Sequence, residues 1–165
     1  MKRLIIFCRI LLVLCGSKAA TGQVHPPQPI SVFVNPAQGM NFGAFFQGIT
    51  GGTVILYPNG SRSVTGDIIQ AGLGFSFSPA IFEIEALPGT IIHVLNGPDI
   101  QLTGTNGGSL TLHLGTSDPS TPFITTAIPP SRTLVRIGGT LTVSSPIANP
   151  SGSYSGMFQV TFIQE

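Results

Sequence analysis

The amino-acid sequence predicts an all-β protein that folds as an antiparallel β-sandwich, and three observations point to this class. Apolar and polar residues alternate at period two in short runs, as in strands with one wet face. Turn-forming residues interrupt the runs about every eight to twelve positions, which is typical of sandwiches. No window keeps the spacing of an amphipathic helix. A closed barrel is the alternative architecture.

The expected strands begin at residue 30 and follow one another along the chain. Residues 30–34 are expected to form the first strand of the domain, and residues 157–163 the last. Three runs show the alternation: Phe82, Ile84 and Ala86 oppose Glu83 and Glu85; Leu110, Leu112 and Leu114 oppose Thr111 and His113; Phe158, Val160 and Phe162 oppose Gln159 and Thr161. In each run, the apolar set is expected to face the core.

Residues 51–66 read GGTVILYPNGSRSVTG, which predicts a hairpin. A β-branched and aromatic run at 53–57 is followed by Pro58, which suits the second position of a type I turn. Asn59-Gly60 can then supply the positive φ that closes the hairpin, and residues 61–65 return antiparallel. The glycines therefore serve backbone geometry.

Further turn signals divide the rest of the chain into short strands. They are Leu87-Pro88-Gly89, Asn96-Gly97-Pro98-Asp99, Asn106-Gly107-Gly108, Asp118-Pro119, Pro129-Pro130, Gly138-Gly139 and Asn149-Pro150-Ser151-Gly152.

Residues 1–22 have the pattern of a secretory signal peptide. Lys2 and Arg3 precede a short apolar run, and small residues follow it. The run is shorter than the roughly 20 apolar residues of a membrane-spanning helix, and Arg9 interrupts it. Cleavage is expected after Gly22, with residues 17–19 as the second candidate. The alternatives are a retained helix and lipid attachment at Cys15. The chain is thus expected in the periplasm, at the outer surface or outside the cell, without spanning a membrane.

Removal of the signal changes both the redox chemistry and the charge of the chain. Cys8 and Cys15 are the only cysteines, and both lie in the segment that is removed. The mature chain therefore has no disulfide, and its hydrophobic core alone must stabilise the fold. Four of the seven basic residues and none of the six acidic ones lie in residues 1–22, which leaves a net charge of −3. Because phosphate binding needs clustered Lys and Arg, nucleic acid is not expected as a partner. After a Pro-rich lead-in at residues 23–29, residues 30–165 are long enough for one β-sandwich domain.

Histidines and carboxylates do not form a motif that predicts a site. His25, His93 and His113 lack a third metal ligand at a recognisable spacing, and Asp99 or Asp118 would be the candidates. Glu83 and Glu85 lie two apart on one strand, whereas glycosidases usually set two carboxylates on different elements. These residues are therefore interpreted as a solvated surface.

Other polar motifs are interpreted as structural. Asp67, Asp99 and Asp118 are too far apart for a calcium loop. Residues 104–108 are Gly-rich but precede a strand and lack the Lys of a phosphate-binding loop. Asn59-Gly60-Ser61 matches a glycosylation pattern and is interpreted as an ordinary turn. Tyr154, just before the last strand, is expected to tie a connection through its hydroxyl, as in the tyrosine corner of sandwiches. The sequence thus predicts no catalytic, cofactor-binding or metal-binding residue.

Four segments resemble, in order, a bacterial family of domains of unknown function numbered 4402 (DUF4402). They are MNFGAF at 40–45; GGTV at 51–54 with PNGSR at 58–62 and TG at 65–66; RIGGTLTV at 136–143, which resembles a late strand of the family; and GSYSGMFQVTF at 152–162, which resembles its closing strand. The resemblance implies export in Gram-negative bacteria and an immunoglobulin-like or pilin-like sandwich, similar to pilin-like and spore-coat-U-like domains. It transfers no catalytic residue.

The resemblance also implies a structural role, with one departure from pilins. Pilins that exchange donor strands carry an N-terminal extension of alternating apolar residues, whereas residues 23–29 are short and rich in proline, which cannot donate to a β-ladder. The expected function is that of an exported, non-enzymatic, pilin-like or adhesin-like surface subunit that pairs with protein partners or with itself through a sheet edge. A carbohydrate- or ligand-binding module is the alternative.

Overall fold

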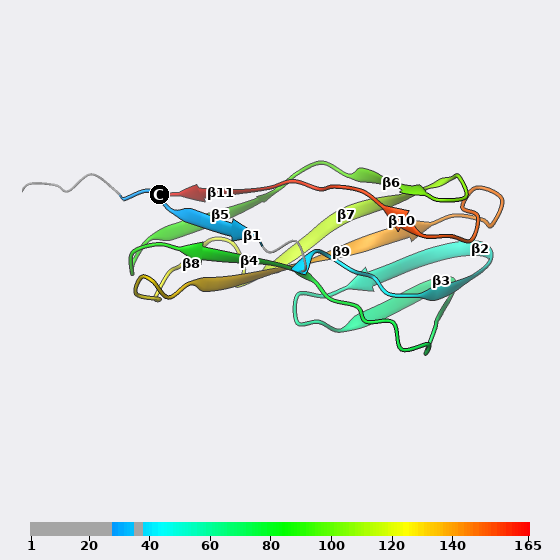
Figure 1. The fold of residues 1–165 in the computed structure, drawn as a ribbon, viewed down its shortest axis with the longest axis horizontal. Coiled ribbons are helices and arrows are strands. Elements are labelled where there is room, and N and C mark those ends of the chain that lie inside the picture. The colour runs from blue at the N-terminus through cyan, green and yellow to red at the C-terminus, as the bar shows by residue number, and fades with distance from the viewer. Residues whose placement is uncertain (1–27, 35–37) are drawn as a thin grey trace, which may run out of the picture.

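Antiparallel β-strands build the whole of the described fold, which confirms the predicted class (Figure 1). The computed structural model describes residues 28–34 and 38–165. The strands are β1 (Ser31–Val34), β2 (Phe45–Leu56), β3 (Arg62–Gln70), β4 (Ala80–Glu85), β5 (Ile91–Asn96), β6 (Ile100–Gly104), β7 (Ser109–Asp118), β8 (Phe123–Ile124), β9 (Thr133–Val143), β10 (Tyr154–Ser155) and β11 (Val160–Gln164).

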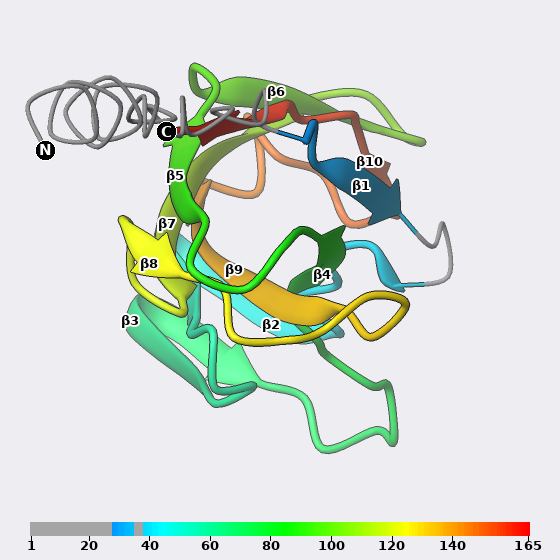
Figure 2. The same cartoon turned by 90° about the vertical axis from the view of Figure 1, so that its left-hand side faces the viewer.

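The strands form two sheets that enclose the core. The larger sheet runs in the order β1-β4-β9-β7-β6-β10, with β2 and β3 attached beside β9, and the smaller sheet runs β11-β5-β8. Seen end-on, the strands curve around a common centre (Figure 2). Phe82 of β4 and Phe162 of β11 meet edge-to-face with ring centroids 5.3 Å apart, which ties one sheet to the other.

The long strand β9 is the centre of the larger sheet because it pairs with two strands along one side. Its first half pairs with β4, up to Ile137 opposite Ala80, and its second half pairs with β2 from Gly139 opposite Leu56. Gly138 lies at this fork, where a Cβ would press against the carbonyl of Leu56 and the ring of Pro58. The Gly-Gly pair in β9 therefore leaves room for two strands to meet.

The hairpin of β2 and β3 has the predicted turn. The amide of Gly60 donates to the carbonyl of Tyr57 at 2.9 Å, and the amide of Tyr57 donates to the carbonyl of Ser61 at 2.9 Å. Gly60 has a φ of +84°, which a glycine adopts without strain. The prediction for residues 53–65 is confirmed.

A four-residue bulge in the same hairpin explains the glycines before Thr53. The register of β2 against β3 shifts between Gln47 and Gly52, so residues 48–51 lie opposite Asp67 alone. The carboxylate of Asp67 accepts a hydrogen bond from the amide of Thr50 at 3.3 Å. Gly51 has a φ of +75°, and a Cβ there would overlap the carbonyls of Val143 and Ser144 at the end of β9. The bulge needs glycine for two independent reasons.

The alternating apolar residues face the core as predicted, in two neighbouring clusters. One cluster gathers Leu110, Leu112 and Leu114 with residues of β2, β6 and β9. The other gathers Phe82, Ile84 and Ala86 with residues of β5, β8 and β9. Three partly buried residues pack against both clusters: Met40, Phe158 and Val160.

The two terminal strands occupy sheet edges. Among the described strands, β1 pairs only with β4, and β11 pairs only with β5. The last strand starts at Val160, later than the predicted residue 157, because the chain first crosses from β10 in one sheet to β11 in the other. Met157 lies in this crossing and is 92 % exposed.

The predicted signal peptide, Cys15, His25 and most of the Pro-rich lead-in lie outside the described residues. Within residues 28–34 and 38–165, no helix has the length and apolarity needed to cross a membrane.

Candidate functional site

The paired carboxylates of β4 are bound by one arginine. Arg132 Nη1 lies 2.8 Å from Glu83 Oε2, and Arg132 Nε lies 3.6 Å from Glu85 Oε2. The guanidinium also stacks on the ring of Phe33 in β1, 3.5 Å from its centroid. The hydrogen bond that Arg132 donates to Glu83 raises the pKa of Arg132 above its ordinary value, with a smaller contribution from Glu85. This cluster fastens β1 to β4 and β9, which fits the structural interpretation of the two glutamates.

Sequence reasoning missed Arg132, and no local signal pointed to it. The pairing of Glu83 with Leu134 and of Ile84 with Thr133 places Arg132 beside the end of β4. This neighbourhood depends on the β4–β9 register, which a single sequence does not reveal.

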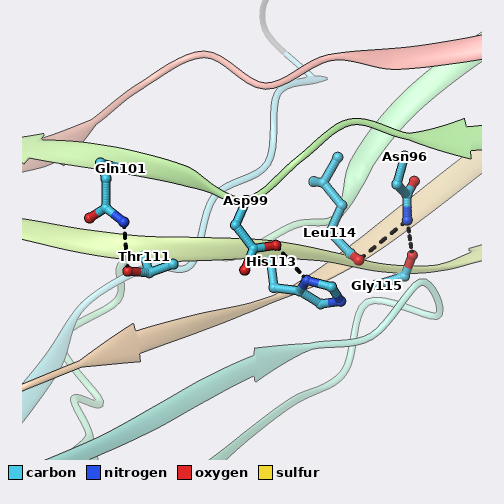
Figure 3. A network of polar contacts seen from close by, with 7 residues as sticks. All are labelled: Asn96, Asp99, Gln101, Thr111, His113, Leu114 and Gly115. Atoms are coloured by element: carbon cyan, nitrogen blue, oxygen red, sulfur yellow. Dashed lines mark hydrogen bonds and ion pairs between the residues drawn. The ribbon is translucent and has the colours of Figure 1, made fainter.

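His113 and Asp99 form a surface pair on the outer side of the larger sheet (Figure 3). His113 Nδ1 lies 2.6 Å from Asp99 Oδ1, and both side chains are more than half exposed. Asp99 precedes β6 and His113 lies on the adjacent β7, so the β6–β7 register brings the two together. The structure thus joins one histidine with one of the two aspartates considered as candidate ligands.

His93 lies on β5 and has a different partner. Its Nε2 lies 3.3 Å from Glu165 Oε1, an ion-pair distance without the geometry of a hydrogen bond. The described segments contain no cluster of three or more His, Cys, Asp or Glu side chains suited to a metal ion.

Amide and hydroxyl side chains make further polar contacts between neighbouring strands. Asn96 donates through Nδ2 to the carbonyl of Leu114 at 3.2 Å and to that of Gly115 at 2.7 Å (Figure 3). Gln101 donates to Thr111 Oγ1 at 2.9 Å. The first two bonds join β5 of the smaller sheet to β7 of the larger one.

The Gln101–Thr111 pair belongs to an uncharged polar row that crosses five strands. Successive register partners in β6, β7, β9, β2 and β3 are Gln101, Thr111, Thr142, Thr53 and Thr65. Thr53 and Thr65 join through their hydroxyls at 2.6 Å. Directly paired residues share a face of the sheet, so the row lies on the side opposite the core.

Tyr154 has the predicted structural role. Its hydroxyl donates to the carbonyl of Pro150 at 2.6 Å, which closes the connection before β10. Asn149, which is buried, accepts from the amide of Ser144 and donates to the carbonyl of Ser109. The turn after β9 is therefore held by side chains at both ends.

The two remaining polar motifs are hairpin turns. Residues 104–108 join β6 to β7, with Gly107 and Gly108 at positive φ. The Asn59 side chain accepts from the amide of Ser61 at 2.9 Å, which stabilises the turn between β2 and β3.

A groove of about 760 Å³ with an apolar floor and a partly polar rim opens over one half of the larger sheet. This volume lies within the range of about 300–1,000 Å³ typical of ligand sites. Five core side chains of β6, β7 and β9 contribute to its lining: Leu102, Leu110, Leu112, Leu141 and Val143. Residues 40–47 and 150–156 also line it, and none of the lining residues is charged. Sequence reasoning did not predict this groove.

A segment without backbone hydrogen bonds to the described residues lies beside the groove, and its residues Gly156 and Phe158 contribute to the lining. Within the described chain, Gly156, Met157 and Phe158 make no backbone hydrogen bond. A Cβ on Gly156 would collide with Leu102, so the chain passes close to β6 at this point. The groove therefore combines apolar side chains with free backbone groups.

Comparison with known proteins identifies a family without naming an activity. No curated protein and no solved structure matches the chain. The family described as "Domain of unknown function (DUF4402)" matches residues 32–163, most of the chain. The chain belongs to the DUF4402 family.

Proposed function

We propose that the chain is an exported, non-enzymatic surface subunit, pilin-like or adhesin-like, that joins a protein partner through the free edge of β1. The observation that carries this proposal is the exposure of β1. Val32 lies opposite Ile84 and Val34 opposite Phe82. Both β4 residues are buried, so the valines point to the core face of the sheet. Nevertheless, Val32 is 41 % exposed and Val34 is 61 % exposed.

This edge lacks the charges, prolines and bulges that protect many strand edges from pairing. Protected edges carry charges, prolines or bulges, whereas β1 reads Ser-Val-Phe-Val and pairs with β4 without a register shift. A strand added beside β1 would satisfy its free backbone groups and cover Val32 and Val34.

The environments of the ionisable groups also favour a structural role. Arg132 binds Glu83 and Glu85, and Asp99 binds His113. The signal-peptide pattern and the low charge of the mature sequence agree with export and with a surface role.

The test is the assembly of the mature chain, residues 23–165, measured by light scattering after size exclusion and by electron microscopy. We expect concentration-dependent assembly into species larger than a dimer, loss of these larger species in Val34→Lys, and no effect of Ile128→Lys, a control at a loop residue that is 72 % exposed. A strict monomer at high concentration that also captures no partner in cell-surface crosslinking would contradict the proposal, as would normal assembly of Val34→Lys.

A second candidate function is carbohydrate binding by the polar row. Five adjacent strands present hydroxyl and amide groups without charge, which suits the hydroxyls of a glycan. The test is a glycan array with the wild type and with Thr142→Val, at an exposed position in the middle of the row. Loss of a signal in the variant would support this function, and an array without signal would remove it.

A further inference from the structure

A protruding apolar segment lies directly beside the groove. Leu73, Phe75 and Phe77 alternate with Gly74 and Ser76 between β3 and β4. Leu73 and Phe75 are each 62 % exposed, whereas Phe77 is 37 % exposed and stacks on Arg62. This alternation is that of a strand, although the segment forms none in this structure.

The segment is anchored at both ends to one wall of the groove. The amide of Ala71 donates to the carbonyl of Ala44 at 3.3 Å, and Ser78 and Asn41 exchange two backbone hydrogen bonds. Phe75 itself contributes to the groove lining. A protrusion and a recess of matching chemistry therefore lie side by side on the same face.

The apolar surface also extends outward from the rim. Phe46 lines the groove and is 56 % exposed, and its cross-strand partner Ile69 is 66 % exposed. Neither the groove lining nor residues 71–79 include a charged side chain. An occupant of this groove should be uncharged, with apolar side chains for its floor, and residues 71–79 meet both requirements.

We propose that two copies of the chain associate groove to groove, with Phe75 of each copy entering the groove of the other. A two-fold interface requires a surface that is complementary to itself, and the adjacent protrusion and recess meet this requirement. In the partner's groove, the segment lies extended beside Gly156, Met157 and Phe158, which make no backbone hydrogen bond to the described part of their own chain and so can pair with it. This interface is separate from the β1 edge and does not depend on it.

The first test measures the dimer dissociation constant by analytical ultracentrifugation of the mature chain carrying Val34→Lys, which blocks the β1 edge and leaves the groove interface. We expect Phe75→Asp to weaken dimerisation by more than about tenfold, because the aromatic side chain would be the anchor of the interface. Ile128→Asp, at a similarly exposed residue elsewhere, should leave the dissociation constant unchanged. Circular dichroism checks that each variant keeps its strands.

The second test uses the absence of cysteine after residue 22. Copies carrying Phe75→Cys are mixed with copies carrying Ser155→Cys, a groove residue, under mild oxidation. We expect mixed disulfide dimers in this mixture and few when Ile128→Cys replaces Phe75→Cys. Equal crosslinking of the two mixtures, or an unchanged dissociation constant in Phe75→Asp, would overturn the inference.

The two interfaces can be told apart by their variants. If Phe75→Asp assembles normally and Val34→Lys does not, the groove interface is refuted and the proposed function stands. If the reverse holds, the groove interface stands and the β1 edge is refuted.

Discussion

Alanine at Gly51 should destabilise the fold for two separable reasons, and two other glycines isolate them. Gly51 has a φ of +75°, and its added Cβ would overlap the backbone carbonyls of Val143 and Ser144. Gly60 has a φ of +84° but open space around its Cβ position, and Gly72 has open space without a positive φ. The series therefore adds first backbone strain and then steric overlap.

The expected costs follow from these environments. Gly72→Ala should be neutral or stabilise the fold by up to about 1 kcal/mol, because alanine restricts the unfolded chain. Gly60→Ala should cost about 1–2 kcal/mol for the left-handed backbone. Gly51→Ala should cost the same ~1–2 kcal/mol for its backbone and about 1–3 kcal/mol more, because the carbonyls of Val143 and Ser144 must move. The sum is a large part of the 5–15 kcal/mol that stabilises a typical domain.

The assay is urea unfolding of the mature chain followed by far-UV circular dichroism, with the slope compared between variants. The reasoning predicts that Gly51→Ala is the least stable, Gly60→Ala intermediate and Gly72→Ala the most stable. Equal midpoints for Gly51→Ala and Gly60→Ala would refute the close approach of the bulge to β9.

Three further predictions concern the core, Tyr154 and the Arg132 cluster. Leu112→Ala should cost about 2–5 kcal/mol in urea unfolding because Leu112 is buried, whereas Thr111→Ala on the other face should cost much less. Tyr154→Phe should cost about 0.5–1.5 kcal/mol by losing the hydrogen bond to Pro150, and an unchanged midpoint would count against that bond. The pKa of Arg132 is raised in the folded chain, so its stabilisation is present below its ordinary pKa and lost only as the pH rises through the raised value. The stability difference between wild type and Arg132→Met should therefore stay constant from about pH 6 to pH 9, as checked by urea unfolding at each pH.

The sequence allowed prediction of those parts of the fold that depend on neighbouring residues. The alternation of Phe82, Ile84 and Ala86 identified a core face because strand periodicity is local. Pro58 and Gly60 identified a turn for the same reason. Tyr154 was predicted because its hydrogen bond spans four residues along the chain.

Features that depend on strand order could not be predicted from local patterns. Arg132 reaches Glu83 across 49 positions, through the pairing of β9 with β4. The groove requires β6, β7 and β9 to lie side by side, and the sequence pattern does not give that order. The Gly138-Gly139 pair was interpreted as a turn, which is wrong: it lies within β9, at the point where one neighbouring strand replaces another.

Amide hydrogen exchange of β1 tests the central claim most directly. If an incoming strand pairs with its free edge, the amides of residues 32–34 that face outward should exchange much more slowly in the assembled mature chain than in dilute monomer. The amides of the turn at residues 59–61 should exchange equally in both. Identical exchange of β1 in the two states would contradict the account, because it would leave this strand unpaired when the chains associate.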